Sequence, residues 1–127
     1  MKNYESEVRM RWGNTDSYRE YEQKTKNYTQ EKWAEVNDGL MTIFAELAAC
    51  KDRGVDVTAA ETVTLISNLQ AYITANYYTC TDEIFTGLGR MYLADPRFKE
   101  NIDKYGEGTA EFVSETIDSF CRRKQHD

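Results

Sequence analysis

The strongest helical signal lies in residues 30–51, which read QEKWAEVNDGLMTIFAELAACK. Apolar residues recur there at steps of three and four, so they share one face of a helix: Trp33, Val36, Leu40, Ile43, Phe44, Leu47 and Cys50. Thr29 is a candidate N-cap, and Arg53-Gly54 supplies a stop signal. We therefore predict a helix from about Gln30 to Lys51 that buries this face.

Two more helices are predicted after this one. The first begins at Thr58-Ala59-Ala60-Glu61, where the spacing of Thr and Glu is that of a capping box. The second begins after Thr81, a candidate N-cap, and contains Gly87 and Gly89. Glycine costs ~1 kcal/mol against alanine inside a helix, so close approach by another helix or by a ligand should compensate.

In the last third of the chain the sequence predicts that one helix ends, that a short helix follows directly, and that a final helix forms. Asp95 is placed to cap a short helix that has Pro96 at its first position. Gly106-Glu107-Gly108 then turns the chain, and a final helix is predicted from about Thr109 to Arg123. Strand-like alternation is missing, so we predict an all-α fold, a single helical bundle.

Length, charge and hydropathy exclude several classes of protein. The 127 residues fit one domain, and 16 basic against 22 acidic residues give a net charge of −6. An acidic chain does not neutralise phosphates, which argues against DNA or RNA binding by this piece. No apolar run approaches the ~20 residues of a membrane span, and the first residues lack a signal-peptide core. We expect a cytoplasmic protein with no membrane partner.

Cysteine and histidine content limits the possible chemistry. The cysteines, Cys50, Cys80 and Cys121, are widely spaced and odd in number, which is typical of reduced thiols in a cytosolic protein. The one histidine is His126, beside the C-terminus. A His-based zinc site, a Ser-His-Asp triad and a Cys-His dyad are therefore excluded, and a His-ligated haem is disfavoured. We expect no cofactor, no metal and no catalytic residue.

The aromatic content is high for so polar a chain. Nine Tyr, five Phe and two Trp accompany a mean hydropathy of −0.75, and a disordered tail would be poor in aromatics. In residues 1–28 apolar residues are too sparse to hold a long helix, although Thr15 or Asp16 could cap a short one through Tyr18 and Tyr21. We predict a conditionally ordered lid over residues 1–28 and a helical core over residues 29–127.

Two parts of the sequence agree in order and spacing with one known family. The first comprises RWGNTDSY at 11–18, KTKNY at 24–28 and EKW at 31–33. The second comprises YYTCTDE at 77–83, GLGRMY at 87–92 and DPRF at 95–98. With Ile102-Asp103 and the final helix, these runs span nearly the whole chain, which resembles the TipA-type antibiotic-recognition domains, the TipAS family.

The resemblance implies a globin-like helical fold without haem. It implies a cleft for thiopeptide-like or related macrocyclic antibiotics, over which a mobile N-terminal segment closes. Domains of this family usually follow the DNA-binding helix-turn-helix of a MerR-type regulator. We therefore expect DNA contact only through a separate N-terminal domain not present in this chain, or else a stand-alone drug-sequestering protein. As an isolated domain the chain is expected to be a monomer.

Cys80 is the position that matches a family cysteine able to add to a dehydroalanine of the antibiotic. The resemblance thus implies a candidate covalent attachment point. The residues themselves leave two readings open. A helix N-terminus after Cys80 would lower the thiol pKa, whereas Asp82 and Glu83 would raise it. A buried structural cysteine is the alternative, since free cysteine is among the most buried residue types.

The candidate ligand-binding residues are Cys80 and seven aromatics: Trp12, Tyr18, Trp33, Phe44, Tyr77, Tyr78 and Phe85. Trp12 and Tyr18 would stack from the lid or simply pack a first helix. Tyr77, Tyr78 and Phe85 flank Cys80, and one of them is expected to be core. Trp33 and Phe44 lie on the helical stripe, as core or as pocket wall. Cys50 and Cys121 are expected in the core.

Three functions compete at this point. The first is a non-enzymatic antibiotic-binding domain that acts as a sensor or sequesters the drug. The second is a hydrolase or transferase on the same ligand, for which the sequence offers no nucleophile with a base. The third is a protein–protein interaction domain whose aromatics form a partner surface.

Overall fold

The structure, a computed structural model, describes residues 16–126. In that range the chain forms six helices and no strand, which confirms the all-α prediction: α2 (Asp16–Thr25), α3 (Gln30–Asp52), α4 (Ala60–Asn76), α5 (Asp82–Ala94), α6 (Pro96–Asp103) and α7 (Thr109–His126).

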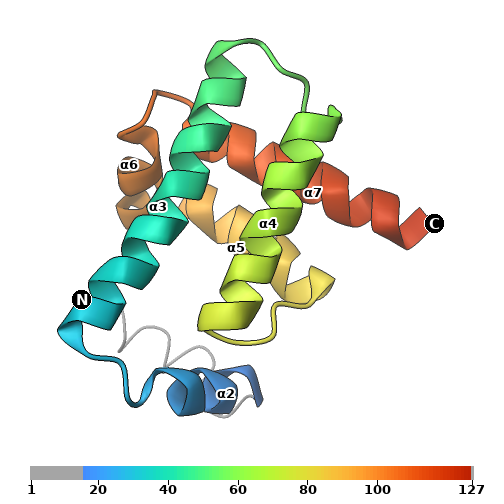
Figure 1. Cartoon of the computed structure of the whole chain (residues 1–127). Coiled ribbons are helices and arrows are strands. Elements are labelled where there is room, and N and C mark those ends of the chain that lie inside the picture. Colours follow the sequence, from blue (N-terminus) through green and yellow to red (C-terminus); the bar gives the residue numbers. More distant parts are fainter. Residues whose placement is uncertain (1–15, 127) are drawn as a thin grey trace.

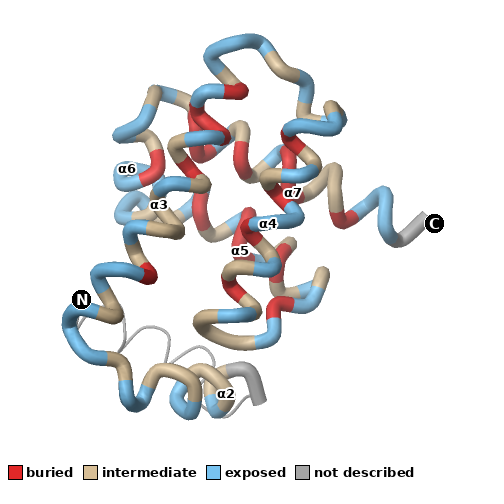
Figure 2. The backbone as a smooth tube through the Cα atoms, viewed as in Figure 1, coloured by how far each residue is buried: buried red, intermediate tan, exposed pale blue. Residues whose placement is uncertain are grey.

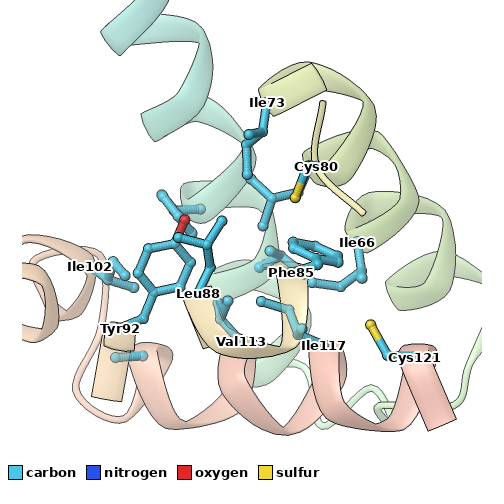
Figure 3. Packing of buried hydrophobic residues seen from close by; sticks show 14 residues of the cluster. Ile66, Ile73, Cys80, Phe85, Leu88, Tyr92, Ile102, Val113, Ile117 and Cys121 are labelled. Carbon is cyan, nitrogen blue, oxygen red and sulfur yellow. The ribbon is translucent and has the colours of Figure 1, made fainter. Parts of the chain in front are cut away.

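The helices stack in two layers around one core. Figure 1 shows α3 and α4 side by side and antiparallel, with α5 and α7 crossing behind them and α6 at one edge. Buried positions gather where these layers face each other (Figure 2). Figure 3 shows the core between the layers, which includes Ile66, Ile73, Phe85, Leu88, Tyr92, Ile102, Val113 and Ile117. Burial of these apolar side chains is the main force that stabilises the bundle.

Helix α2 lies apart from the two layers. It lies at the end of the bundle where α3 begins and α4 ends (Figure 1). This is the short helix predicted through Tyr18 and Tyr21, and its side chains from Tyr18 to Thr25 are half-buried or exposed.

The ends of α3 follow the predicted signals. The Thr29 hydroxyl accepts a hydrogen bond from the Lys32 amide at 3.1 Å, as an N-cap does. At the other end Gly54 adopts a left-handed φ of 74°. The Gly54 and Val55 amides then donate to the carbonyls of Lys51 and Cys50, a Schellman motif that satisfies carbonyls left open by the helix end.

Two later caps are also confirmed. The Thr81 hydroxyl accepts from the Ile84 amide at 3.2 Å and begins α5. An Asp95 oxygen accepts from the Arg97 amide at 3.0 Å and begins α6, with Pro96 in the first turn.

The capping box predicted at Thr58 is wrong. Helix α4 has Ala59 as its N-cap, with no side-chain cap. Asp56 accepts from both the amide and the hydroxyl of Thr58, each at 2.8 Å, and this local turn holds the hydroxyl that would have capped the helix. Glu61, the other half of the predicted box, pairs with Arg53 instead.

The two glycines of α5 have different surroundings. A Cβ added to Gly89 would lie 3.2 Å from Cγ2 of Ile117, so α7 approaches the backbone of α5 closely there, as predicted. Gly87 is exposed, with nothing within 4 Å of such a Cβ, and the structure gives no reason for it.

We predict that Asp95→Ala lowers the free energy of unfolding by about 1 kcal/mol, because it removes the cap of α6. The change also removes the 2.8 Å ion pair between Asp95 and Arg97. Urea denaturation measures the effect. Glu100→Ala, at an exposed position of the same helix, is the matched control and should change stability by less than about 0.5 kcal/mol. Equal effects of the two variants would contradict the capping role.

Candidate functional site

Aromatic side chains gather where α2 meets the ends of α3 and α4. The group, called the aromatic cluster below, consists of Tyr18, Tyr21, Tyr28, Trp33 and Tyr77. Tyr21 stacks on Tyr77 with ring centroids 6.5 Å apart and planes 12° apart. Tyr28 meets Trp33 edge-on at 5.1 Å, and Trp33 lies 6.3 Å from Tyr77. All five side chains are half-buried, so aromatic surface remains accessible at this end of the bundle.

Polar contacts fix the cluster to the C-terminal end of α4. The Tyr28 hydroxyl donates to the Asn76 carbonyl at 2.7 Å, and the Lys24 ammonium donates to the Thr74 carbonyl. Lys32 lies over the Tyr28 ring, 5.7 Å from its centroid. The hydrogen bonds from Tyr28 and Lys24 satisfy carbonyls in the last turn of α4, which have no partner within the helix.

A close approach of α3 and α4 lies behind the cluster. The Tyr72 hydroxyl donates to the Val36 carbonyl at 2.7 Å and rests over Gly39. A Cβ on Gly39 would lie 2.8 Å from Cζ of Tyr72, so only glycine leaves room for the ring. Burial, and next the charge of Glu35, raises the pKa of Tyr72, which keeps the hydroxyl protonated as a donor.

The predicted aromatics divide into two sets. Tyr18, Trp33 and Tyr77 come together in the aromatic cluster, while Tyr78 is half-buried and packs against the main core. Phe44 and Phe85 are 1% and 0% exposed, in edge-on contact with Tyr92 and Phe120 respectively. Both phenylalanines are therefore core residues, with no surface open to a ligand in this conformation. Trp12 lies outside the described residues.

Cys80 sits in the turn between α4 and α5 and points into the core beside Ile73 and Phe85 (Figure 3). It is 4% exposed, and burial, followed by the nearby Cys121 and Asp82, raises the pKa of its thiol to about 12. At pH 7 the thiol is therefore protonated and shielded from solvent, which makes it a poor nucleophile in this conformation. Cys50 and Cys121 are also buried, as predicted for core residues.

Around Cys80 a polar network joins three helices. Gln70 of α4 donates to the Cys80 carbonyl at 2.8 Å and to a carboxylate oxygen of Asp82 at 2.9 Å. Lys124 of α7 lies 3.3 Å from the same oxygen. The Gln70 bond, and then Lys124, hold the pKa of Asp82 below its ordinary value. Through these contacts the carboxylate fixes the start of α5.

Sequence reasoning missed Tyr21, Tyr28 and Glu20. Tyr21 follows Tyr18 by three residues, a helical spacing that could have placed both rings on one face. Tyr28 and Glu20 reach their partners 48 and 59 residues away along the chain, and no local pattern predicts such contacts.

An open groove of about 560 Å³ lies at the opposite end of the bundle, between the end of α3 and the start of α4. Its rim carries the Arg53–Glu61 ion pair at 2.5 Å. Of the predicted site residues within 16–126, none lines this groove.

Over residues 16–126 no group of three or more His, Cys, Asp or Glu side chains is arranged to hold a metal ion. None of the helices described is long and apolar enough to cross a membrane.

Comparison with known proteins agrees with this arrangement. The model of the TipAS antibiotic-recognition domain family matches residues 4–120. The HTH-type transcriptional activator TipA of Streptomyces coelicolor is 37% identical over 114 residues, which cover 90% of this chain and 45% of that protein. The HTH-type transcriptional activator mta of Bacillus subtilis is 32% identical over 123 residues, 97% of this chain and 47% of its own. The chain spans less than half the length of these curated relatives.

A solved structure shares the fold. TipAS from Streptomyces lividans, determined in complex with the thiopeptide antibiotic nosiheptide, superimposes with a TM-score of 0.86 at 35% identity. The match covers 97% of this chain and 86% of that one. This likeness confirms the predicted globin-like helical fold. The extent of the family match and the identity to TipA together place this chain in the TipAS antibiotic-recognition domain family.

Proposed function

We propose that this chain binds thiopeptide antibiotics without acting as an enzyme, and that the aromatic cluster receives the flat rings of the ligand. The observation that carries the proposal is the gathering of half-buried Tyr and Trp rings at one end of a fold whose relative TipAS binds nosiheptide. Each aromatic pair contributes about 0.5–1.5 kcal/mol beyond the burial of its area. Several rings at one site therefore suit a ligand rich in thiazoles.

The wider role follows from the relatives. TipA and mta are named HTH-type transcriptional activators, and this chain matches less than half of each. We propose that it senses the drug for a cytoplasmic regulator in which a separate domain contacts DNA. A stand-alone protein that sequesters the drug is the second form of the same function.

The other predicted site residues have different roles in this proposal. Trp12 and Tyr18 belong to the lid over residues 1–28, and Tyr78 borders the cluster through Tyr77. Phe44 and Phe85 belong to the buried core against which Tyr77 and Tyr78 pack. Covalent capture by Cys80 would form a sulfur–carbon bond at the β-carbon of a dehydroalanine, while the thiol proton moves to its α-carbon. That step requires the turn that carries Cys80 to open.

Thermal unfolding with and without nosiheptide tests the proposed function. At a ligand concentration 100 times the Kd, binding to the folded state adds about 2.7 kcal/mol and raises the Tm by several degrees. Mass spectrometry of the recovered ligand checks for chemical change in the same samples. A processed ligand would show an enzyme. An unchanged Tm over a range of thiopeptides would overturn the proposal and favour a surface for a protein partner.

A further inference from the structure

The turn between α4 and α5 is held by side chains from two helices. From Thr79 to Thr81 the backbone is irregular, so its amides need partners outside the helical ladders. The Thr74 hydroxyl accepts from the Cys80 amide at 3.1 Å, and Gln70 donates to the Cys80 carbonyl. Both of these residues belong to α4. The side chain that binds Thr79 belongs to α2.

Glu20 of α2 grips Thr79 with both carboxylate oxygens. One accepts from the Thr79 amide at 2.8 Å, and the other accepts from the Thr79 hydroxyl at 2.7 Å. These two bonds hold the pKa of Glu20 below its ordinary value, which shows that they favour the charged carboxylate. One turn later Lys24 pairs with Glu20 at 3.6 Å and donates to the Thr74 carbonyl. Thr74 is the residue whose hydroxyl holds Cys80.

The other described contacts of α2 are made by side chains that are at most half-buried. None of its described side chains is fully buried, and Tyr21 and Tyr18 supply its aromatic contacts. A segment with so few buried contacts opens at lower free energy than the core. When α2 leaves, Thr79 loses both of its hydrogen bonds to Glu20 at once. Cys80 is the next residue, and its thiol reaches solvent only if this turn moves away from the core.

We propose that Glu20 is a positioning residue that couples the docking of α2 to the opening of the 77–81 turn, and thereby sets how accessible the Cys80 thiol is. While α2 is docked, the carboxylate clamps Thr79 and the thiol stays buried. When α2 is displaced, the clamp is lost and the turn opens more often. The clamp deepens the proposed function, because it rests on Cys80 as a candidate attachment point, but its test needs no antibiotic.

The test compares the full chain with its Glu20→Ala, Glu20→Gln and Glu22→Ala variants. Each protein is treated with N-ethylmaleimide, and an accessible cysteine thiol adds across the carbon–carbon double bond of this reagent. Peptide mass spectrometry then measures the rate of modification of each of the three cysteines separately. We expect Glu20→Ala to modify Cys80 about tenfold faster than wild type or more, since the variant loses two hydrogen bonds to Thr79 and the loss of one such bond already shifts an opening equilibrium by about that factor. Glu20→Gln keeps one acceptor and should give an intermediate rate. Glu22 is exposed on the same helix, so Glu22→Ala should match wild type.

Cys50 separates local opening from global unfolding. It is buried at the C-terminal end of α3 beside Arg53, at the far end of the bundle from Thr79, so its rate should stay unchanged in every variant. Amide exchange of Thr79 should accelerate in parallel with the Cys80 reaction. Equal Cys80 rates in Glu20→Ala and Glu22→Ala would overturn the proposal, and so would a common acceleration of all three thiols. Failure of nosiheptide to bind would bear on the proposed function and leave this result untouched.

Discussion

Replacing Trp33 with alanine is expected to weaken nosiheptide binding by about 30-fold or more, the loss typical of a central aromatic residue at a binding site. Trp33 contacts three other rings of the aromatic cluster, those of Tyr21, Tyr28 and Tyr77. Its removal deletes the largest flat surface of the cluster and frees its neighbours to move. Isothermal titration calorimetry at a temperature well below the Tm measures the change in affinity.

The control for Trp33 is Tyr105→Ala. Tyr105 is 40% exposed in the segment between α6 and α7 and takes no part in the aromatic cluster. This variant should bind nosiheptide as wild type does. An unchanged affinity in Trp33→Ala, with wild-type folding, would remove the aromatic cluster from the binding site.

Replacing Phe85 with alanine is expected to lower the free energy of unfolding by about 3–5 kcal/mol, which is the usual cost of deleting a buried aromatic ring. Phe85 is 0% exposed and meets Phe120 edge-on at 6.4 Å. Because the free energy of unfolding of such a domain is about 5–15 kcal/mol, the variant loses a large part of its stability. Urea denaturation monitored by far-ultraviolet circular dichroism gives the value.

Leu93→Ala is the matched control for Phe85. It lies on the same helix but is 41% exposed, and a surface change there should cost less than about 0.5 kcal/mol. A loss below about 1 kcal/mol in Phe85→Ala would mean that the core can close around the cavity, and would argue against tight packing between α5 and α7.

Helix positions and ends were largely readable from the sequence because they depend on neighbours along the chain. Thr29, Thr81 and Asp95 each cap a helix through an amide two or three residues away. The exception at Thr58 is equally local. Two turn signals competed for one hydroxyl, and Asp56, two residues before it, holds it in the structure. Sequence reasoning weighed only the capping box.

The site was harder to predict, because burial and long-range contact decide it. For Cys80 the sequence leaves two readings open, a reactive thiol beside a helix N-terminus and a buried structural cysteine. The structure buries the side chain, and this burial is the largest cause of its raised pKa. Phe44 and Trp33 lie on one predicted helical stripe, but only Phe44 is enclosed by the bundle. Trp33 lies in the first turn of α3, outside the buried core, and Tyr21 of α2 is one of its ring neighbours. The ordering of residues 1–28 upon ligand binding stays a prediction.

Chemical-shift mapping during a nosiheptide titration shows where the antibiotic binds. If the aromatic cluster is the binding site, the largest shifts occur in the rings and amides of Tyr21, Tyr28, Trp33 and Tyr77. The groove beside Arg53 and Leu65, at the other end of the bundle, should hardly change. Shifts concentrated in that groove, or around Leu93 and Tyr105, or no shifts at saturating ligand, would show that the aromatic cluster does not bind the antibiotic.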